Sequence, residues 1–183
     1  MMRDAVHRPG ETLEYPPVIL RRWQPGQLEA VYRAVIQAQA HLRPWTPWAD
    51  PYTRDSAAEF LAGCDDDWQS GTAFGYAITV GGRLAGGCGL MARTGPGGLE
   101  IGYWVHPDYL RRGLATAAAA ALTDAALLLP GVDHVEIVHD ELNEASAGVP
   151  RKLGYTRVGE RPLDMRSEAG PGTGVVWRLS RSG

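Results

Sequence analysis

Runs of apolar residues predict that this chain mixes strands with helices. Short runs rich in β-branched and aromatic residues, bounded by glycine or proline, are typical of strands. We expect strands at residues 18–23, 74–80, 84–91, 100–105, 135–138, 155–160 and 175–180. Gly81-Gly82 separates the second run from the third and predicts a tight hairpin turn.

Other segments show the spacing of amphipathic helices. The first runs from Leu28 to Ile36. The second begins at Ser56-Ala57-Ala58-Glu59, which we interpret as a capping box. Its expected buried stripe is Phe60, Leu61, Cys64 and Trp68. A long alanine-rich helix has the expected buried face Leu114, Ala118, Ala121, Leu122, Ala125 and Leu128. A short helix is expected from about Ala145 to Leu153.

The order of these elements predicts an α/β or α+β fold. Hairpins come first and helices separate the later strands, which is typical of a mixed, mostly antiparallel sheet, here of about six or seven strands flanked by helices. The length of 183 residues predicts a single domain over 1–183. Residues 1–15 are mostly polar, and we expect them to form a loose N-terminal segment.

Composition and charge exclude several classes of function. The formal net charge of −3 argues against general nucleic-acid binding, which needs clustered basic charge. No apolar run is long enough to span a bilayer, and no secretory signal is visible, so we expect a cytoplasmic protein without a membrane partner. The only cysteines, Cys64 and Cys88, have no metal or redox spacing, so we expect no metal.

The stretch from Glu100 to Thr116 contains the best candidate for a ligand site. Proline at position 107 ends the expected strand, and the alanine-rich helix follows. Gly113 leaves the first turn open, so several backbone N–H groups can bind one anion, helped by the helix dipole. A plain helix N-terminus would show the same pattern. The expected ligands of a diphosphate are Arg111, Arg112, Gly113, Leu114, Ala115 and Thr116.

Three ordered motifs resemble the GNAT superfamily of N-acetyltransferases. Arg112-Gly113-Leu114-Ala115-Thr116 is similar to its acyl-CoA pyrophosphate loop, although Leu110 stands where the signature Gln/Arg-x-x-Gly-x-Gly/Ala begins. Asn143-Glu144-Ala145-Ser146, with Leu153-Gly154-Tyr155 downstream, is similar to its Asn-x-x-Ser and Leu-Gly-Phe/Tyr pattern. Residues 41–48, HLRPWTPW, resemble the first helix and loop of the RimJ/RimL branch. The resemblance covers roughly residues 20–179.

The resemblance implies a sheet that splays between two parallel strands, 100–105 and 135–139. The pantetheine arm of acetyl-CoA would lie in the gap against Trp104 and Val105, and N–H groups near Val105 would stabilise the oxyanion. Glu100 is the implied general base, with an ordinary strand-start glutamate as the alternative. Asn143 and Ser146 are implied near the sulfur, besides capping a helix. The implied wall of the acceptor pocket is His41, Trp45 and Trp48; aromatic residues of the core are the alternative.

A second expectation concerns the departing thiolate. Many members of the superfamily have a tyrosine seven residues after the asparagine, and Pro150 stands at that position here. The thiolate would then leave unassisted, or with help from Ser146 or water, and Tyr155 is not expected to substitute.

The implied activity is transfer of an acetyl group from acetyl-CoA, as cosubstrate, to a primary amine by direct attack. The acceptor can be a protein N-terminus or a small molecule, and the protein can be a monomer or a homodimer. Three alternatives stay open: a non-catalytic acyl-CoA sensor, an acyltransferase for another acyl-CoA, and an interaction domain whose glycine turn is structural.

Overall fold

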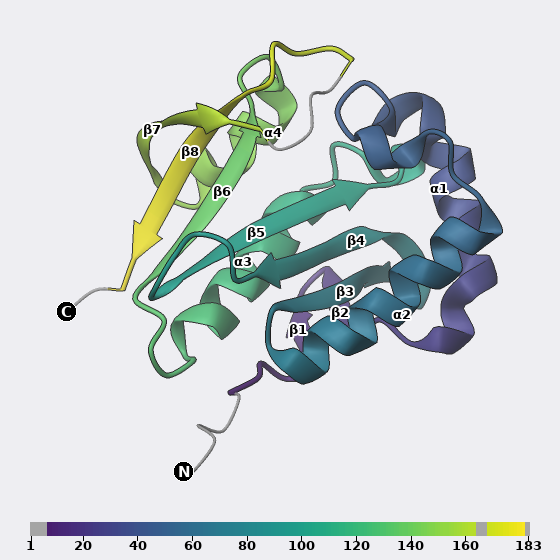
Figure 1. Ribbon diagram of the computed structural model, residues 1–183, viewed down its shortest axis with the longest axis horizontal. Helices are drawn as coiled ribbons and strands as arrows, with labels where there is room; N and C mark the ends of the chain where they lie inside the picture. The colour runs from purple at the N-terminus through teal and green to yellow at the C-terminus, as the bar shows by residue number, and fades with distance from the viewer. Residues whose placement is uncertain (1–6, 164–167, 182–183) are drawn as a thin grey trace.

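Eight strands form one sheet in the computed structural model, which describes residues 7–163 and 168–181 (Figure 1). The strand order is β1-β2-β3-β4-β5-β6-β8-β7, and only β5 and β6 run parallel to each other among these described strands. Their bounds are β1 Thr12–Tyr15, β2 Val18–Arg22, β3 Ala73–Val80, β4 Arg83–Met91, β5 Gly98–Val105, β6 His134–Asp140, β7 Thr156–Pro162 and β8 Thr173–Ser180. The prediction of a mixed, mostly antiparallel sheet is confirmed.

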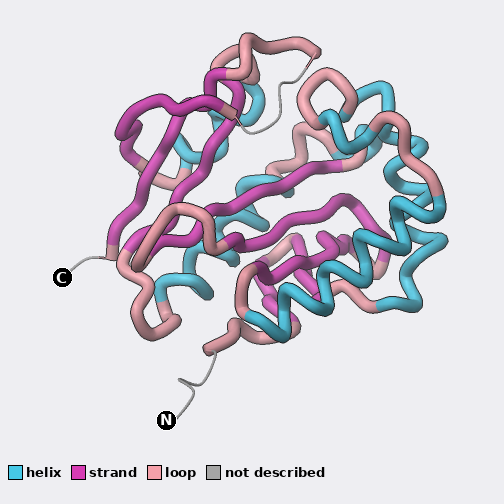
Figure 2. The backbone as a smooth tube through the Cα atoms, viewed as in Figure 1, coloured by secondary structure: helices cyan, strands magenta, loops and turns pink. Residues whose placement is uncertain are grey.

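Helices cover both faces of the sheet, as Figure 2 shows in cyan against magenta strands. Two of them, α1 (Leu28–Leu42) and α2 (Arg54–Ser70), pack on one face and bury a cluster around Trp23 and Ala77. On the other face, the alanines of α3 (Leu114–Leu127) pack against apolar side chains of β2 to β6. The short α4 (Glu144–Lys152) lies on the α3 side. The α1–α2 layer leaves the same face of β6, β8 and β7 without a helix.

Strands β5 and β6 separate along their length. They pair from Gly98↔His134 to Ile101↔Ile137, and the pairing ends there although β5 continues to Val105 and β6 to Asp140. The carboxyl ends of the two parallel strands therefore diverge, as the resemblance implied. The gap opens toward the same end of the sheet as the N-terminus of α3.

Glycines in β4 let aromatic residues lie directly on the sheet. A Cβ at Gly87 would lie 2.6 Å from Trp104 Nε1, and one at Gly86 would lie 2.1 Å from the Trp104 carbonyl oxygen. The indole of Trp104 therefore occupies the space of a missing side chain. Close approach of Trp104 thus explains why β4 has glycine at positions 86 and 87.

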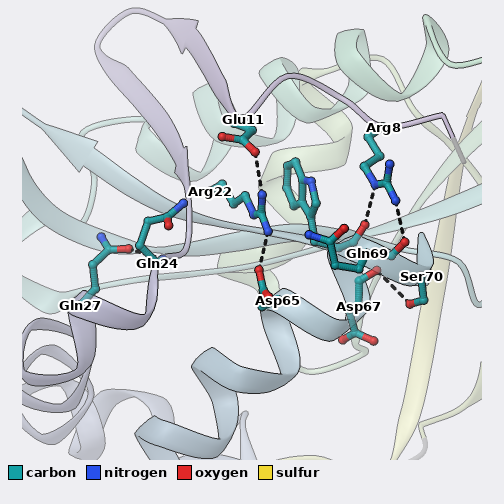
Figure 3. Close-up of polar contacts among 10 residues, drawn as sticks. Arg8, Glu11, Arg22, Gln24, Gln27, Asp65, Asp67, Gln69 and Ser70 are labelled. Atoms are coloured by element: carbon teal, nitrogen blue, oxygen red, sulfur yellow. Dashed lines mark hydrogen bonds and ion pairs between the residues drawn. The ribbon is translucent and has the colours of Figure 1, made fainter.

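Regular structure begins closer to the N-terminus than predicted. Thr12–Tyr15, expected to be loose, forms β1 and pairs with β2. Arg8 donates to the carbonyl oxygens of Trp68 and Gln69 at 2.8 and 2.6 Å, and Arg22 bridges Glu11 and Asp65 (Figure 3). These contacts tie the segment to β2 and α2. The first six residues of the predicted loose segment lie outside the described residues.

Two details of the helices correct the sequence analysis. Helix α2 begins at Arg54, with a capping box formed by Thr53 and Ser56, so the box predicted at Ser56–Glu59 is one turn too late. Phe60, expected in the buried stripe, keeps 39% of its surface exposed, and Leu128, expected on the buried face of α3, keeps 84%. Helix α3 ends at Leu127, so helical periodicity no longer applies to Leu128. Within the described residues, no helix is long and apolar enough to cross a membrane.

The cap of α2 gives a direct test of this fold. Thr53 Oγ1 accepts the backbone N–H of Ser56 at 3.1 Å, and Ser56 Oγ accepts that of Thr53 at 3.2 Å. Thr53→Ala should lower the free energy of unfolding by about 1 kcal/mol, because one N–H of the first turn loses its acceptor. Urea denaturation measures the change. Thr53→Ser keeps the oxygen and should recover most of the loss; equal stability of all three proteins would contradict the assignment of the cap.

Candidate active site

A cavity of about 560 Å³ opens where β5 and β6 separate. Its floor is the middle of β4 and β5, and its walls come from α2, the loop after α1, the end of β6 and the start of α4. Residues from each wall include Cys64 and Asp67 of α2, Trp45 and Trp48 of the loop, His139 and Asp140 of β6, Asn143 and Ser146 near α4, and Arg161 of β7. The cavity therefore joins segments from the whole length of the chain.

The backbone of β5 turns hydrogen-bonding groups toward the gap. Hydrogen-bonded and non-hydrogen-bonded residues alternate along an antiparallel pair. His106 N–H donates to the Ala85 carbonyl oxygen at 2.8 Å, so His106 is in a hydrogen-bonded pair with β4, and by alternation Trp104 is too. Tyr103 and Val105 are in the non-hydrogen-bonded pairs, so their backbone N–H and C=O groups point away from β4. Because β6 has diverged at this point, the N–H and C=O groups of Tyr103 and Val105 face the gap. The oxyanion role predicted near Val105 is compatible with this direction and stays a prediction.

The loop before α3 exposes backbone donors. Arg111 has φ of +60° and Gly113 has φ of +74°, and both residues are exposed. No side chain caps the N-terminus of α3, and a Cβ at Gly113 would meet no atom within 4 Å. Ala117 N–H is the first to find a partner in the helix, the Gly113 carbonyl oxygen at 2.9 Å. The N–H groups of the first turn, together with two arginines, form an open site that suits a diphosphate.

Glu100 is held from both sides by arginines. Its side chain is 3% exposed, and its two oxygens accept from Arg93 after β4 and from Arg161 of β7. The carboxylate lines the cavity. It lies within β5 and is buried, whereas the sequence analysis placed it at the edge of the strand. An ionised carboxylate has about four lone-pair sites, so each oxygen can still accept from a water molecule.

Asn143 and Ser146 occupy the start of α4 as the motif suggested. Asn143 Oδ1 accepts the backbone N–H of Ser146 at 3.1 Å, which is the N-cap bond, and both residues line the cavity. Ser146 Oγ lies 3.0 Å from the hydroxyl of Tyr103. The sequence analysis missed Tyr103; its only signal was strand alternation, which points it to the face opposite Trp104.

Two other polar side chains are already satisfied inside the protein. His139 Nδ1 donates to the Asp140 carbonyl oxygen at 2.8 Å, and its Nε2 accepts from Trp177 Nε1 at 2.9 Å. This arrangement fixes a neutral imidazole with both nitrogens occupied. The Tyr155 hydroxyl lies 2.7 Å from Thr123 Oγ1 of α3, and Tyr155 does not line the cavity. Neither side chain is placed to move a proton at the cavity.

The aromatic loop after α1 forms part of the cavity wall. Trp45 and Trp48 line the cavity, and the Trp48 ring lies edge-on to that of Trp104 with centroids 6.4 Å apart. His41 is exposed on the last turn of α1 and does not line the cavity. Two of the three side chains implied for the acceptor pocket are thus brought together. Within the described residues, no three His, Cys, Asp or Glu side chains are grouped so that they could hold a metal ion.

Comparison with protein families identifies the family of this chain. Residues 18–156 match the acetyltransferase (GNAT) domain family. This chain belongs to the GNAT acetyltransferase family. It is therefore an acyl-CoA-dependent acyltransferase.

Individual relatives agree with this assignment. The chain is 27% identical over 149 residues to the "Putative ribosomal N-acetyltransferase YdaF" of Bacillus subtilis (strain 168), covering 78% of this chain and 80% of that protein. Among solved structures, the ribosomal L7/L12 alpha-N-protein acetyltransferase RimL in complex with coenzyme A superposes with a TM-score of 0.84 at 20% identity, over 93% of this chain and 98% of that one. RimJ of Mycobacterium smegmatis in complex with CoA-disulfide gives 0.82 at 21% identity, over 98% and 90%. These structural likenesses concern the fold.

The cysteines of this GNAT protein are poor nucleophiles. Both line the cavity. Burial, with a smaller contribution from Asp67, raises the pKa of Cys64 to about 12, and burial also raises the pKa of Cys88. Both therefore stay protonated thiols near neutral pH, and the thiolate is the reactive form. The site favours direct attack on the thioester over an acyl-cysteine intermediate.

Alkylation measures this protection. At pH 8, Cys64 should react with iodoacetamide roughly 10³-fold more slowly than an ordinary cysteine, because a pKa near 12 leaves so little thiolate. Peptide mapping of labelled protein over time gives the rate. Protein unfolded in urea provides the reference; labelling of Cys64 at the same rate in both states would contradict the raised pKa.

Proposed function

We propose that this protein transfers the acetyl group of acetyl-CoA to a primary amine by direct attack, at the N-terminus of a protein or on a small molecule. The separation of β5 and β6 over a cavity that carries Glu100 and Ser146 is the observation that carries the proposal. Bound acetyl-CoA supplies the activated acyl group; the residues of the chain bind it, orient it and handle protons. Holding the two reactants together accounts for much of the rate.

The cofactor side of the site follows the backbone. The N–H groups of Leu114, Ala115 and Thr116, with the exposed Arg111 and Arg112, would hold the diphosphate, since no side chain caps α3 and Ala117 N–H makes the first helical bond. The gap-facing groups of Tyr103 and Val105 would continue the strand pairing toward the pantetheine arm. This path leads from the loop before α3 into the cavity, where Trp104 and Asn143 complete the lining.

The acceptor side is lined by indoles and a carboxylate. Trp45 and Trp48 would enclose the acceptor beside Glu100, whereas His41, exposed on the last turn of α1, could contact only a part of the acceptor that extends outside the cavity. An amine with a pKa of about 8 to 10.4 must lose a proton before it attacks. We assign that proton to Glu100 through a water molecule, because each of its oxygens already accepts from one arginine and retains a second lone pair.

A protein N-terminus is the first acceptor to test. RimL is a ribosomal L7/L12 alpha-N-protein acetyltransferase, and YdaF is a putative ribosomal N-acetyltransferase. The face of β6, β8 and β7 that α1 and α2 leave without a helix adjoins the cavity, since the end of β6 lines it (Figure 1), and a peptide could continue over that face from its N-terminus. A panel should therefore include peptides with free N-termini, small primary amines and lysine derivatives.

Two measurements separate the proposal from its rivals. Melting with acetyl-CoA tests binding, and release of free thiol with the amine panel tests transfer. Stabilisation together with amine-dependent thiol release supports the transferase. If acetyl-CoA stabilises the protein but no amine causes thiol release, the protein is a non-catalytic acyl-CoA sensor. If acetyl-CoA neither stabilises the protein nor loses its acyl group, the protein is an interaction domain. Succinyl-CoA in place of acetyl-CoA tests the acyl preference.

The diphosphate site is tested by Gly113→Asp. A carboxylate there would face the bound diphosphate, so the affinity for acetyl-CoA should fall by about tenfold or more. Isothermal titration calorimetry measures the affinity. Gly113→Asn is the matched control, because it has the same shape and the same strain at positive φ but no charge. A loss in the asparagine variant as large as in the aspartate variant would refute electrostatic recognition at this loop.

The role of Glu100 is tested by Glu100→Gln. Turnover should fall by about 10²-fold or more while acetyl-CoA still binds, since the amide cannot accept the proton. Steady-state kinetics over a range of pH, corrected for folded protein, gives the result. Glu136→Gln is the matched control, because Glu136 is the register partner of Glu100, is equally buried and is paired with Arg178, yet it lies outside the cavity. Equal losses of turnover in both variants would show that Glu100 acts only as a structural member of an ion pair.

A further inference from the structure

Tyr103 and Ser146 form a hydroxyl pair at the wall of the cavity. The Tyr103 hydroxyl lies 3.0 Å from Ser146 Oγ and 3.2 Å from the Ser146 carbonyl oxygen. The two residues come from β5 and α4, on the α3 side of the sheet, and both line the cavity. The N-cap bond from Ser146 N–H to Asn143 fixes the serine backbone. The pair is therefore held between β5 and the capped start of α4, at the point where the strands diverge.

The reaction needs a donor at this wall. The proposed transfer releases a thiolate, and Pro150, on the inner side of α4, has no proton or hydrogen bond to give. Tyr155 is bonded to Thr123 and lies outside the cavity. Of the hydroxyl groups in these segments, the Ser146–Tyr103 pair is the one that reaches the cavity.

We propose that Tyr103 is a positioning residue that orients the hydroxyl of Ser146 toward the departing sulfur. The single phenol hydrogen can go to Ser146 Oγ or to the Ser146 carbonyl oxygen. In the first arrangement the serine hydrogen is left to point into the cavity, where it can donate to the thiolate. The departing thiolate favours that arrangement, because it supplies the acceptor for the serine hydrogen. No proton is transferred: the carbon–sulfur bond breaks, the sulfur takes both electrons, and the serine hydrogen bond stabilises the resulting anion. This inference rests on the proposed transferase function.

Chemistry and burial agree with a fixed donor. A thiol with an ordinary pKa of about 8.5 can leave as an anion, so a hydrogen bond is enough and a strong acid is not needed. Burial raises the pKa of Tyr103 to about 12, and the bond to Ser146 opposes that effect. The phenol thus keeps its hydrogen throughout the working pH range. A hydroxyl that already accepts one hydrogen bond is a better donor of the next, because chains of hydrogen bonds polarise one another.

A double-mutant cycle tests whether Tyr103 acts through Ser146. Tyr103→Phe should lower kcat about fivefold and Ser146→Ala about tenfold, with the KM for acetyl-CoA within about twofold of the wild type. The double variant should be no slower than Ser146→Ala, because the tyrosine has nothing left to orient. The pH profile should keep its shape, since Tyr103 does not titrate below about pH 11.

Tyr155→Phe is the matched control. It removes the hydroxyl of a tyrosine that is also buried, with a pKa also raised to about 12 by burial, but outside the cavity. It should leave kcat unchanged. The inference is overturned if Tyr103→Phe behaves like Tyr155→Phe, if the Tyr103 and Ser146 effects multiply fully in the double variant, or if Tyr103→Phe removes the alkaline limb and so acts as a proton donor. A wild type without turnover would instead reject the transferase function.

A second readout does not depend on turnover. With CoA bound, the serine donor should lower the pKa of the CoA thiol by roughly half a unit to one unit relative to the Ser146→Ala protein. The ultraviolet absorbance of the thiolate, titrated with pH, reports that pKa. In Tyr103→Phe the pKa of the CoA thiol should lie between the values in the wild type and in Ser146→Ala. If Tyr103→Phe does not fold, the comparison of wild type with Ser146→Ala still tests the serine donor. Identical thiol titration in wild type and Ser146→Ala would overturn the inference.

Discussion

The early end of pairing between β5 and β6 is the constraint on which the site depends. Beyond Ile101 and Ile137 the two strands no longer share hydrogen bonds, yet both continue for several residues. Backbone N–H and C=O groups must find partners when they are removed from water. The groups of Tyr103 and Val105 therefore remain available to a ligand that completes the strand. A fully paired sheet would have no gap, no cavity at this position and no exposed backbone for an acyl chain to follow.

Several features of the fold keep that gap open. Helix α3 packs its alanines closely under β5, and residues 106–113 connect the diverging end of β5 to the N-terminus of α3. Arg161 of β7 reaches across to Glu100 of β5 and spans the divided part of the sheet. Removing one partner from a buried ion pair is costly, because it leaves a charge unpaired. The arginine pair on Glu100 therefore couples the geometry of the gap to a carboxylate that lines the cavity.

The cavity separates groups that have different tasks. The α1–α2 side supplies indoles and Glu100, whereas the α3–α4 side supplies Ser146 and Tyr103. Strand alternation produces this division, since Glu100 and Trp104 point to one face of β5 and Tyr103 to the other. Proton removal from the amine and stabilisation of the sulfur can thus occur on opposite sides of one thioester. His139, whose two ring nitrogens already have partners, and the protonated cysteines line the cavity without offering a second nucleophile or base.

Local sequence determined the elements and the motifs of this protein, because periodicity, turn residues and the loop before α3 depend on neighbours along the chain. It predicted the hairpins, the alanine-rich helix, the start of α4 and the cap at Asn143, and the diphosphate loop that it proposed precedes α3. The predictions from local sequence were wrong at the ends of elements. Residues 12–15 form β1 by pairing with β2, α2 is capped by Thr53, and Leu128 lies beyond the end of α3. Only tertiary structure decided the partners of Glu100 and Ser146. Arg161 lies 61 positions from Glu100, and Tyr103 lies 43 from Ser146, so no local pattern records contacts that exist only once the sheet has divided.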